Sequence, residues 1–258
     1  MAFETLLNPI LNPLLGMLGY FWTLLILVFV ITLIITLIYK YTTNQSLMKD
    51  LKAELKSFQK QIKELKSKPD EAMKVQKKMM ETNSKYMMHS FKPMIFTFLP
   101  IIIFFGWMSA HLAYYPILPS EEFSVTMNFN DGVTGNVELI LSEGLSPINE
   151  LNQTITANQA TWFLRGEEGE YLLEYKFNNQ IYNNEVVIST AKDYKEPLSK
   201  IKGGGITDIV INLEKVRPLE KIPLVNSIPW IGGFGWLGTY IILSLIFSSL
   251  LRKMMKIY

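Results

Sequence analysis

The 258-residue sequence contains no cysteine and only two histidines, which lie far apart in the chain. Without cysteine it cannot form disulfides, thiolate zinc sites or iron–sulfur clusters, and it has no cysteine nucleophile. Two distant histidines offer little basis for a metal site or for acid–base catalysis. The triple glycine at 203–205 is followed by neither a lysine nor a helix start, so it predicts a flexible turn and not a phosphate loop. We therefore expect neither an enzyme nor a bound metal or cofactor.

Charged residues are also scarce, at 19% against 49% hydrophobic residues, and they are missing from three long runs. A helix of about 20 apolar residues is about 30 Å long, the thickness of the hydrocarbon core of a bilayer. These runs predict transmembrane helices over residues 20–39, 93–115 and 230–251. The first run is too long for a signal peptide, and no small-residue cleavage site follows it. Residues 1–19 are apolar but broken by Pro9 and Pro13, which predicts an outer interfacial segment.

The remaining charges are segregated along the chain. Residues 40–92 hold 13 basic and 6 acidic residues, a net charge of +7, whereas residues 115–229 hold 9 basic and 16 acidic residues, a net charge of −7. The positive-inside rule counts Lys and Arg near the ends of the spans. Here these are Lys40, Lys49, Lys85, Lys92, Arg252 and Lys253. All lie on one side, so we predict a multi-pass protein of the cell (plasma) membrane with its N terminus outside and its basic tail, residues 252–258, in the cytosol.

Residues 40–92 predict a cytosolic antiparallel coiled-coil hairpin that ends in a Met-rich segment. Apolar residues recur every three or four positions, the seam of a coiled coil, at Leu47, Leu51, Leu55, Phe58, Ile62 and Leu65. Pro69 then interrupts the pattern, and proline is favoured in the first turn of a new helix. Two arms of about 20 residues would each be about 30 Å long.

Residues 120–220 predict an inserted extracellular all-β domain with a sandwich-like fold. Apolar and polar residues alternate over 123–129, 135–139, 171–177, 184–189 and 206–213, with Asn/Gly turn signals between the segments. Six or seven short strands in about 100 residues are typical of a sandwich, and the pattern leaves their topology open. Asn152 begins a glycosylation triplet on the outer side, although such triplets are common by chance.

Polar residues inside the spans suggest a site, because each costs free energy in lipid unless it faces protein or water. Thr32, Thr36 and Lys40 lie on one helix face, and Ser244, Ser248 and Arg252 repeat that spacing. Thr97 lies at a matching depth in the second span. One interpretation is a hydrated groove that is open to the cytosol and lowers the barrier to an incoming chain. The alternative is ordinary helix packing, with hydroxyls bonded to their own backbone and the two cations acting as interfacial anchors.

Six of the 13 methionines lie between residues 73 and 94. Methionine is flexible and polarizable, and it suits surfaces that bind many apolar sequences loosely. Met79 and Met80 are adjacent, as are Met87 and Met88, so one member of each pair should point away from a narrow seam. These four residues are candidates for capturing substrate; the alternative is plain packing of the hairpin against the membrane face.

A family resemblance rests on particular segments. The opening FETLLNPILNPLL, the first span ending in IITLIYKY, the basic coiled coil, the Met-rich return and the closing GWLGTYIILSLIFSSLLRKMMK resemble the archaeal short YidC-like proteins. These belong to the Oxa/YidC/Alb superfamily of membrane insertases and are similar to subunit 3 of the endoplasmic reticulum membrane protein complex. The resemblance covers roughly residues 3–115 and 228–256.

The resemblance implies an N-out core of three helices, a cytosolic coiled coil, a hydrophilic groove open to the cytosol and a Met-rich loop that contacts substrates. It places the groove on the seven polar residues above and first capture on the four methionines. Two features depart from the family. The larger bacterial members keep a basic residue deep in the groove, whereas Lys40 and Arg252 lie at its edge. Residues 120–220 are an insertion, and the resemblance says nothing about their role.

The leading hypothesis is a membrane protein insertase or chaperone that works without covalent catalysis or nucleotide hydrolysis. Its expected partners are nascent membrane proteins and the lipid bilayer, with the ribosome bound through the basic coiled coil and no specific nucleic acid sequence recognised. The first alternative is a membrane-anchored surface receptor or assembly factor that works through its β domain. A channel or transporter subunit is weaker, because the three spans contain no carboxylate.

Overall fold

The computed structural model describes residues 2–65, 67–192, 194–220, 222 and 232–257. The chain divides into two compact units. The first comprises residues 1–4, 21–106 and 237–258, and the second comprises residues 5–20 and 107–236. The first unit is helical, and the second combines a β domain with the ends of two helices. We describe each unit by itself.

The first helix, α1, extends over Ala2–Thr42 and changes direction at Gly19. Gly19 has φ 74° and ψ 179°, which lies in a region that residues with a Cβ rarely adopt. The interruption predicted at Pro9 and Pro13 is wrong, since both prolines lie inside the helix. Each proline removes one backbone hydrogen bond, and the buried Leu11 and Leu15 on the same segment offset that loss by packing.

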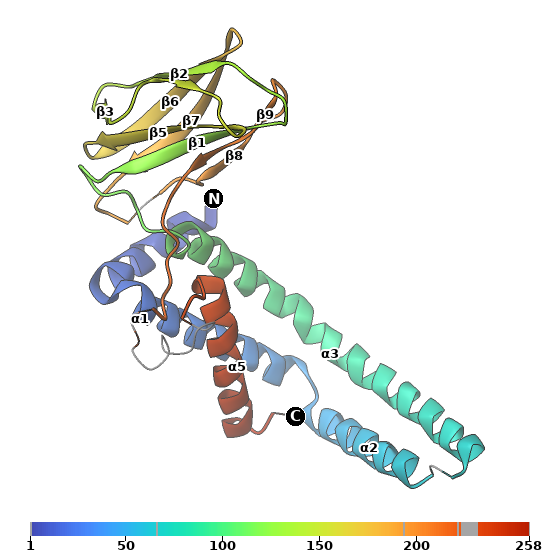
Figure 1. Ribbon diagram of the computed structural model, residues 1–258. Coiled ribbons are helices and arrows are strands. Elements are labelled where there is room, and N and C mark those ends of the chain that lie inside the picture. Colours follow the sequence, from blue (N-terminus) through green and yellow to red (C-terminus); the bar gives the residue numbers. More distant parts are fainter. Residues whose placement is uncertain (1, 66, 193, 221, 223–231, 258) are drawn as a thin grey trace. The chain divides into compact units, whose positions relative to one another are not determined.

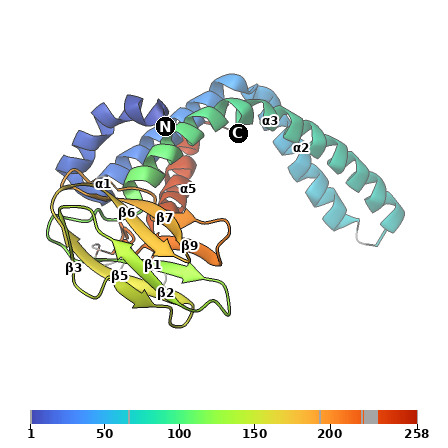
Figure 2. The same ribbon diagram turned by 90° about the horizontal axis from the view of Figure 1, so that it is seen from above.

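Helices α2, Gln45–Glu64, and α3, Pro69–Leu112, follow within a few residues of each other. The Asn44 side chain accepts a hydrogen bond from the Leu47 N–H and so caps the start of α2, while Pro69 supplies the first residue of α3. The two helices lie side by side and run in opposite directions in both views (Figures 1 and 2). Their least exposed residues form one stripe each, at Leu51, Leu55, Phe58 and Ile62 on α2 and at Val75, Met79, Thr82 and Tyr86 on α3.

Three helices are long and apolar enough to cross a membrane, as predicted: Leu6–Thr42, Pro69–Leu112 and α5, Trp236–Met254. The expected start of the third span at residues 230 and 231 lies outside the described residues. Aromatic side chains join these helices within the first unit. The rings of Phe29 and Phe247 lie 5.5 Å apart between α1 and α5, and those of Phe105 and Tyr240 lie 4.7 Å apart between α3 and α5.

The β domain consists of two antiparallel sheets. Its strands are β1 Phe123–Phe129, β2 Asn136–Ile140, β3 Leu145–Pro147, β4 Asn152–Thr154, β5 Gln159–Gly166, β6 Gly169–Phe177, β7 Gln180–Ile188, β8 Leu198–Lys200 and β9 Ile206–Ile211. One sheet has the order β3-β5-β1-β9-β8, and the other has the order β4-β2-β6-β7 (Figure 1). Inward side chains of both sheets form one core, in which Trp162 of β5 packs against Tyr175 of β6 at 5.2 Å. The predicted β domain is therefore present, and the described part has more strands than expected.

Residues 5–20 of α1 pack within the second unit, on the end of α3 and a loop of the β domain. Trp107 Nε1 donates to Asn8 Oδ1 at 3.0 Å, and Lys192 Nζ donates to the Leu15 carbonyl at 2.9 Å. The Tyr194 hydroxyl lies close by and donates to the Ser109 carbonyl at 2.9 Å. Burial raises the pKa of Tyr194 to about 12, so its phenol stays protonated as a donor. The segment thus has protein contacts, and its location at the outer interface stays a prediction.

Trp162→Ala is expected to destabilise the β domain by about 3–5 kcal/mol, because it empties the centre of the core. Phe163→Ala is the matched control, since Phe163 is the next residue of β5 but is 41% exposed on the outer face. Amide hydrogen exchange of β1 and β6 in the full chain, measured over a urea series, reports the difference. Equal effects of the two substitutions would contradict the core assignment.

Candidate functional site

The two threonines of the predicted groove on α1 are buried, and each hydroxyl bonds to its own helix. Thr32 Oγ1 donates to the Val28 carbonyl and Thr36 Oγ1 donates to the Thr32 carbonyl, both at 2.6 Å. A hydroxyl bonded in this way has satisfied its proton inside the helix, so the polar group costs little in an apolar environment. The two buried hydroxyls are therefore satisfied within their own helix and have no proton left to donate. Each oxygen still has a free lone pair.

The serines of α5 lie on the helix face that contacts α1 and α3. Tyr240, Ser244, Phe247 and Leu251 are separated by four, three and four residues, which places them on one face of a helix. Tyr240 and Phe247 make the aromatic contacts to the neighbouring helices. Ser244 and Ser248, on the same helix, are half-buried. The Ser244 hydroxyl donates to the Ile241 carbonyl at 2.9 Å. The threonines of α1 are thus buried, whereas the serines of α5 are half-buried.

The cationic ends of α1 and α5 come together. The Arg252 guanidinium carbon lies 5.0 Å from the centre of the Tyr39 ring, and Tyr39 immediately precedes Lys40. A guanidinium over an aromatic face is attracted by the ring quadrupole, so this contact fixes the end of α5 beside the end of α1. Lys40 is half-buried and Arg252 is exposed. The result is a pair of positive charges at one end of the helical unit, next to the two hydroxyl stripes.

Thr97 is only loosely connected with the other six residues. It is half-buried on α3, and its hydroxyl donates to the Met94 carbonyl at 2.9 Å. Among the residues that the structure describes, it makes no hydrogen bond to the α1 or α5 stripe. Of the seven predicted groove residues, Arg252 makes a contact between α5 and α1 in the described part of the chain, and the grouping of all seven into one groove stays a prediction.

The four candidate capture methionines divide into one packed residue and three exposed ones. Met79 belongs to the half-buried stripe of α3, whereas Met80 is 65% exposed, Met87 is 48% exposed and Met88 is 71% exposed. Phe91 and Met94 extend the exposed apolar surface toward the membrane-crossing part of the helix. Three of the four candidate side chains are therefore accessible.

Tyr39 is the residue of this region that sequence reasoning missed. The sequence places it next to Lys40, where it was counted as the last residue of a hydrophobic run. Only the packing of α5 shows that its ring receives Arg252. No group of three or more metal-ligating side chains occurs in the described part of the chain. The arrangement offers hydrogen-bond acceptors and positive charge, which can attract and guide a polar or acidic chain.

The comparisons with known proteins give one finding. A family model described as "Integral membrane protein EMC3/TMCO1-like" matches residues 4–156, more than half of the 258 residues. The match includes α1, α2, α3 and the beginning of the β domain, and it ends before α5. No curated protein and no solved structure matches the chain.

Tyr39→Leu is expected to loosen the last turns of α5, because it removes the ring under Arg252 while keeping an apolar side chain. A cation–π contact of about 0.5–1 kcal/mol at an exposed site corresponds to about two- to fivefold faster amide exchange over residues 248–254. Tyr41→Leu serves as the control, since Tyr41 is 79% exposed. The same acceleration in both variants would show that the Tyr39–Arg252 contact does not hold the helix end.

Proposed function

The chain belongs to the EMC3/TMCO1-like family of integral membrane proteins, and from this premise we propose that it helps transmembrane segments enter the bilayer. An insertase needs no covalent chemistry. It needs a surface on which a polar flank of the substrate can cross part of the membrane at reduced cost, and an apolar surface that holds the hydrophobic segment beforehand. The helical unit supplies candidates for both.

The polar surface in this proposal is the pair of hydroxyl stripes on α1 and α5. The single observation that carries the proposal is the contact of Arg252 with Tyr39, which joins the ends of α5 and α1 that carry the two cations. The lone pairs of the Thr32 and Thr36 oxygens, left free by their backbone bonds, would accept hydrogen bonds from the polar flank of a substrate. Lys40 and Arg252 would attract acidic residues of that flank.

The apolar surface in this proposal is the exposed methionine cluster of α3, made of Met80, Met87 and Met88. Unbranched side chains can adapt to transmembrane segments of different sequence, which a fixed pocket could not do. The energy for insertion then comes from the substrate, because the transfer of about 20 apolar residues from water to lipid is strongly favourable at roughly 25 cal/mol per Å². The protein lowers the barrier only.

The orientation follows from the segregation of charge. We place α2 and the part of α3 up to residue 92 in the cytosol, as an antiparallel coiled coil beneath a plasma membrane, and the acidic β domain outside. In this arrangement the methionine cluster lies beside the inner membrane surface, where a nascent chain leaves the ribosome. The 13 basic residues between positions 40 and 92 offer a favourable surface for ribosomal RNA without requiring a particular sequence.

Reversing both groove cations, with Lys40→Glu and Arg252→Glu, is expected to slow insertion of a test membrane protein into reconstituted vesicles by about tenfold. This is the effect of losing roughly 1.4 kcal/mol of charge attraction. The measurement is the fraction of substrate protected from protease, followed over time.

Lys52→Glu with Lys253→Glu is the matched control, because it makes the same change in net charge at two exposed positions outside the proposed groove. The control should insert the substrate at nearly the wild-type rate. If the two double variants insert equally well, the electrostatic part of the proposed groove is wrong. If both fail equally, net charge and orientation are responsible and not the groove.

Photo-crosslinking amino acids at Met80 and Met87 are expected to capture a ribosome-bound nascent chain that contains a transmembrane segment. A crosslinker at Gln59, on an exposed face of α2, is the control and should capture much less. Capture should also fall when the hydrophobic segment of the nascent chain is replaced by a polar one. Equal capture at all three positions would show that the methionines do not form the receiving surface.

A further inference from the structure

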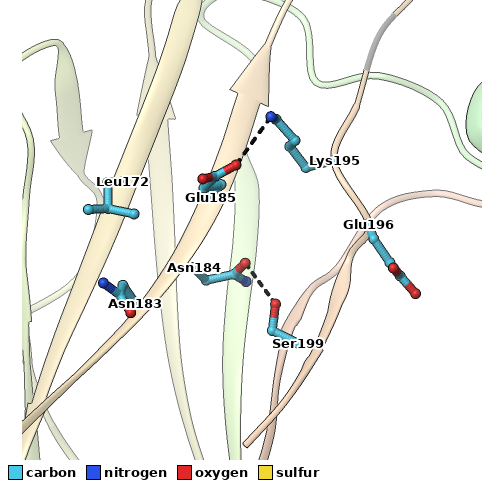
Figure 3. A pocket seen from close by; sticks show the side chains of 7 residues that line it. All are labelled: Leu172, Asn183, Asn184, Glu185, Lys195, Glu196 and Ser199. Atoms are coloured by element: carbon cyan, nitrogen blue, oxygen red, sulfur yellow. Dashed lines mark hydrogen bonds and ion pairs between the residues drawn. The ribbon is translucent and has the colours of Figure 1, made fainter. Parts of the chain in front are cut away.

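A cavity of about 430 Å³ lies at one open side of the β domain, outside the region discussed above. It is lined by Leu172, Asn183, Asn184, Glu185, Lys195, Glu196 and Ser199. Figure 3 shows these side chains, which come from β6, from β7 and from the segment that leads into β8. β7 is the edge strand of one sheet and β8 is the edge strand of the other, so the cavity lies where the two sheets leave a gap.

The edge of β7 presents unused backbone groups to this cavity. Strands β6 and β7 are joined by the two-residue turn Asn178-Asn179, and Phe177 pairs with Gln180. In such a hairpin the residues that bond back to β6 alternate with residues whose N–H and C=O point to the free side. That alternation makes Asn183 and Glu185 outward-facing. Farther along the same edge Ser189 N–H already donates to the Ile117 carbonyl at 2.9 Å, which shows that the edge accepts a neighbouring segment.

A buried amide group beside this edge lacks a partner. Asn184 is 94% buried, at a position of β7 that points toward the core, where an apolar residue is normal. Its Oδ1 accepts a hydrogen bond from the Ser199 hydroxyl at 3.0 Å, across the gap between the strands (Figure 3). Among the residues that the structure describes, its Nδ2 has no hydrogen-bond partner. Burying an amide N–H without an acceptor costs free energy, unless another segment or molecule supplies the acceptor.

The cavity is also acidic. Glu185 and Glu196 line it, and Glu170 lies next to them on β6. Lys195 is the one cation in the lining, and its Nζ lies 3.2 Å from Glu185 and 3.6 Å from Glu170. The hydrogen bond that the Lys195 ammonium donates to Glu185, together with the negative charges of Glu185 and Glu170, raises the pKa of Lys195 above its ordinary value, so it stays charged. Three carboxylates against one ammonium leave a net negative site.

The opposite side of the sandwich is closed by direct bonds between its sheets and loops. There Trp162 Nε1 of β5 donates to the Leu151 carbonyl at 2.9 Å, next to the edge strand β4. Asn149 further bonds the Thr161 carbonyl and the Phe163 N–H. Among the described side chains, the side formed by β7 and β8 is linked across by the Asn184–Ser199 hydrogen bond and by the exposed ion pairs of Lys195 with Glu185 and Glu170. The side formed by β7 and β8 therefore has fewer hydrogen bonds to break before another segment could bind there.

We propose that this side of the β domain binds an extended polypeptide segment that carries a basic side chain. The segment would pair with the outward N–H and C=O groups of Asn183 and Glu185, as in strand addition at a sheet edge. One of its carbonyls would accept from Asn184 Nδ2, and its basic side chain would lie near Glu185 and Glu196. A sugar could also supply hydroxyls to this site, but no aromatic ring lines the described cavity for a sugar to stack on, and a sugar would leave the strand edge unpaired.

The test uses the full chain in lipid nanodiscs and a library of blocked heptapeptides with lysine fixed at the central position and the other positions random. The selected peptides should bind with a Kd that rises at least about tenfold when alternate peptide amides are N-methylated, because methylation removes the edge hydrogen bonds and keeps the side chains. Replacing the central lysine by glutamate should weaken binding similarly. Fluorescence polarisation measures each affinity.

Asn183→Pro should reduce affinity by a similar factor, because proline removes the outward N–H without touching the bonds to β6. Asn152→Pro is the matched control, since Asn152 is outward-facing on β4, the opposite edge of the same sheet. Amide exchange of β6 checks that both variants are folded. The proposal is overturned if no peptide is selected, if N-methylation and Asn183→Pro leave the affinity unchanged, or if oligosaccharides compete for the same site and peptides do not.

Discussion

The cost of leaving a polar group unbonded in hydrocarbon is the constraint on which the helical unit depends. Backbone groups meet it by forming helices, and the hydroxyls of Thr32, Thr36, Thr97 and Ser244 meet it by donating to carbonyls one turn earlier. The same bonds explain how a membrane helix can carry polar atoms on a packed face without a permanent partner. A surface built in this way is stable when empty and can still accept hydrogen bonds, which is what a transient guide for other chains requires.

Hydropathy was sufficient to predict the three long apolar helices, because length and the absence of charge decide that question almost alone. The sequence did not predict that the first 19 residues form a helix through both prolines. Proline was expected to end the helix, yet Pro9 and Pro13 are tolerated and the direction changes at Gly19, where the backbone adopts a positive φ. Leu11 and Leu15 are buried, and the segment bonds to Trp107 and Lys192, which lie far away in the sequence and leave no local signal. The Tyr39–Arg252 contact escaped prediction for the same reason.

In the β domain, strict alternation predicted β1 at its observed bounds, 123–129, and found parts of β2, β6, β7 and β9. It missed β5, because Phe163 occupies an outward position and turns an alternating pattern into an apolar run of three. Strands β3, β4 and β8 have three residues each, too few for a period of two to be visible. The cavity beside β7 could not be anticipated either, since it depends on which strands form the two edges. One residue of the sequence does point to this cavity, because Asn184 occupies a position where the alternating pattern predicts an apolar residue.

The attachment of residues 5–20 to the second unit bears on how the protein is made. Lys192 donates to the Leu15 carbonyl across 177 positions of sequence, so residues 5–20 meet this partner only after many more residues have been synthesised. At about 5–20 residues per second, that interval is on the order of ten seconds or more. Trp107, which bonds Asn8, is synthesised much earlier than Lys192. The packing of residues 5–20 can therefore be completed in steps, first with the end of α3 and later with the β domain.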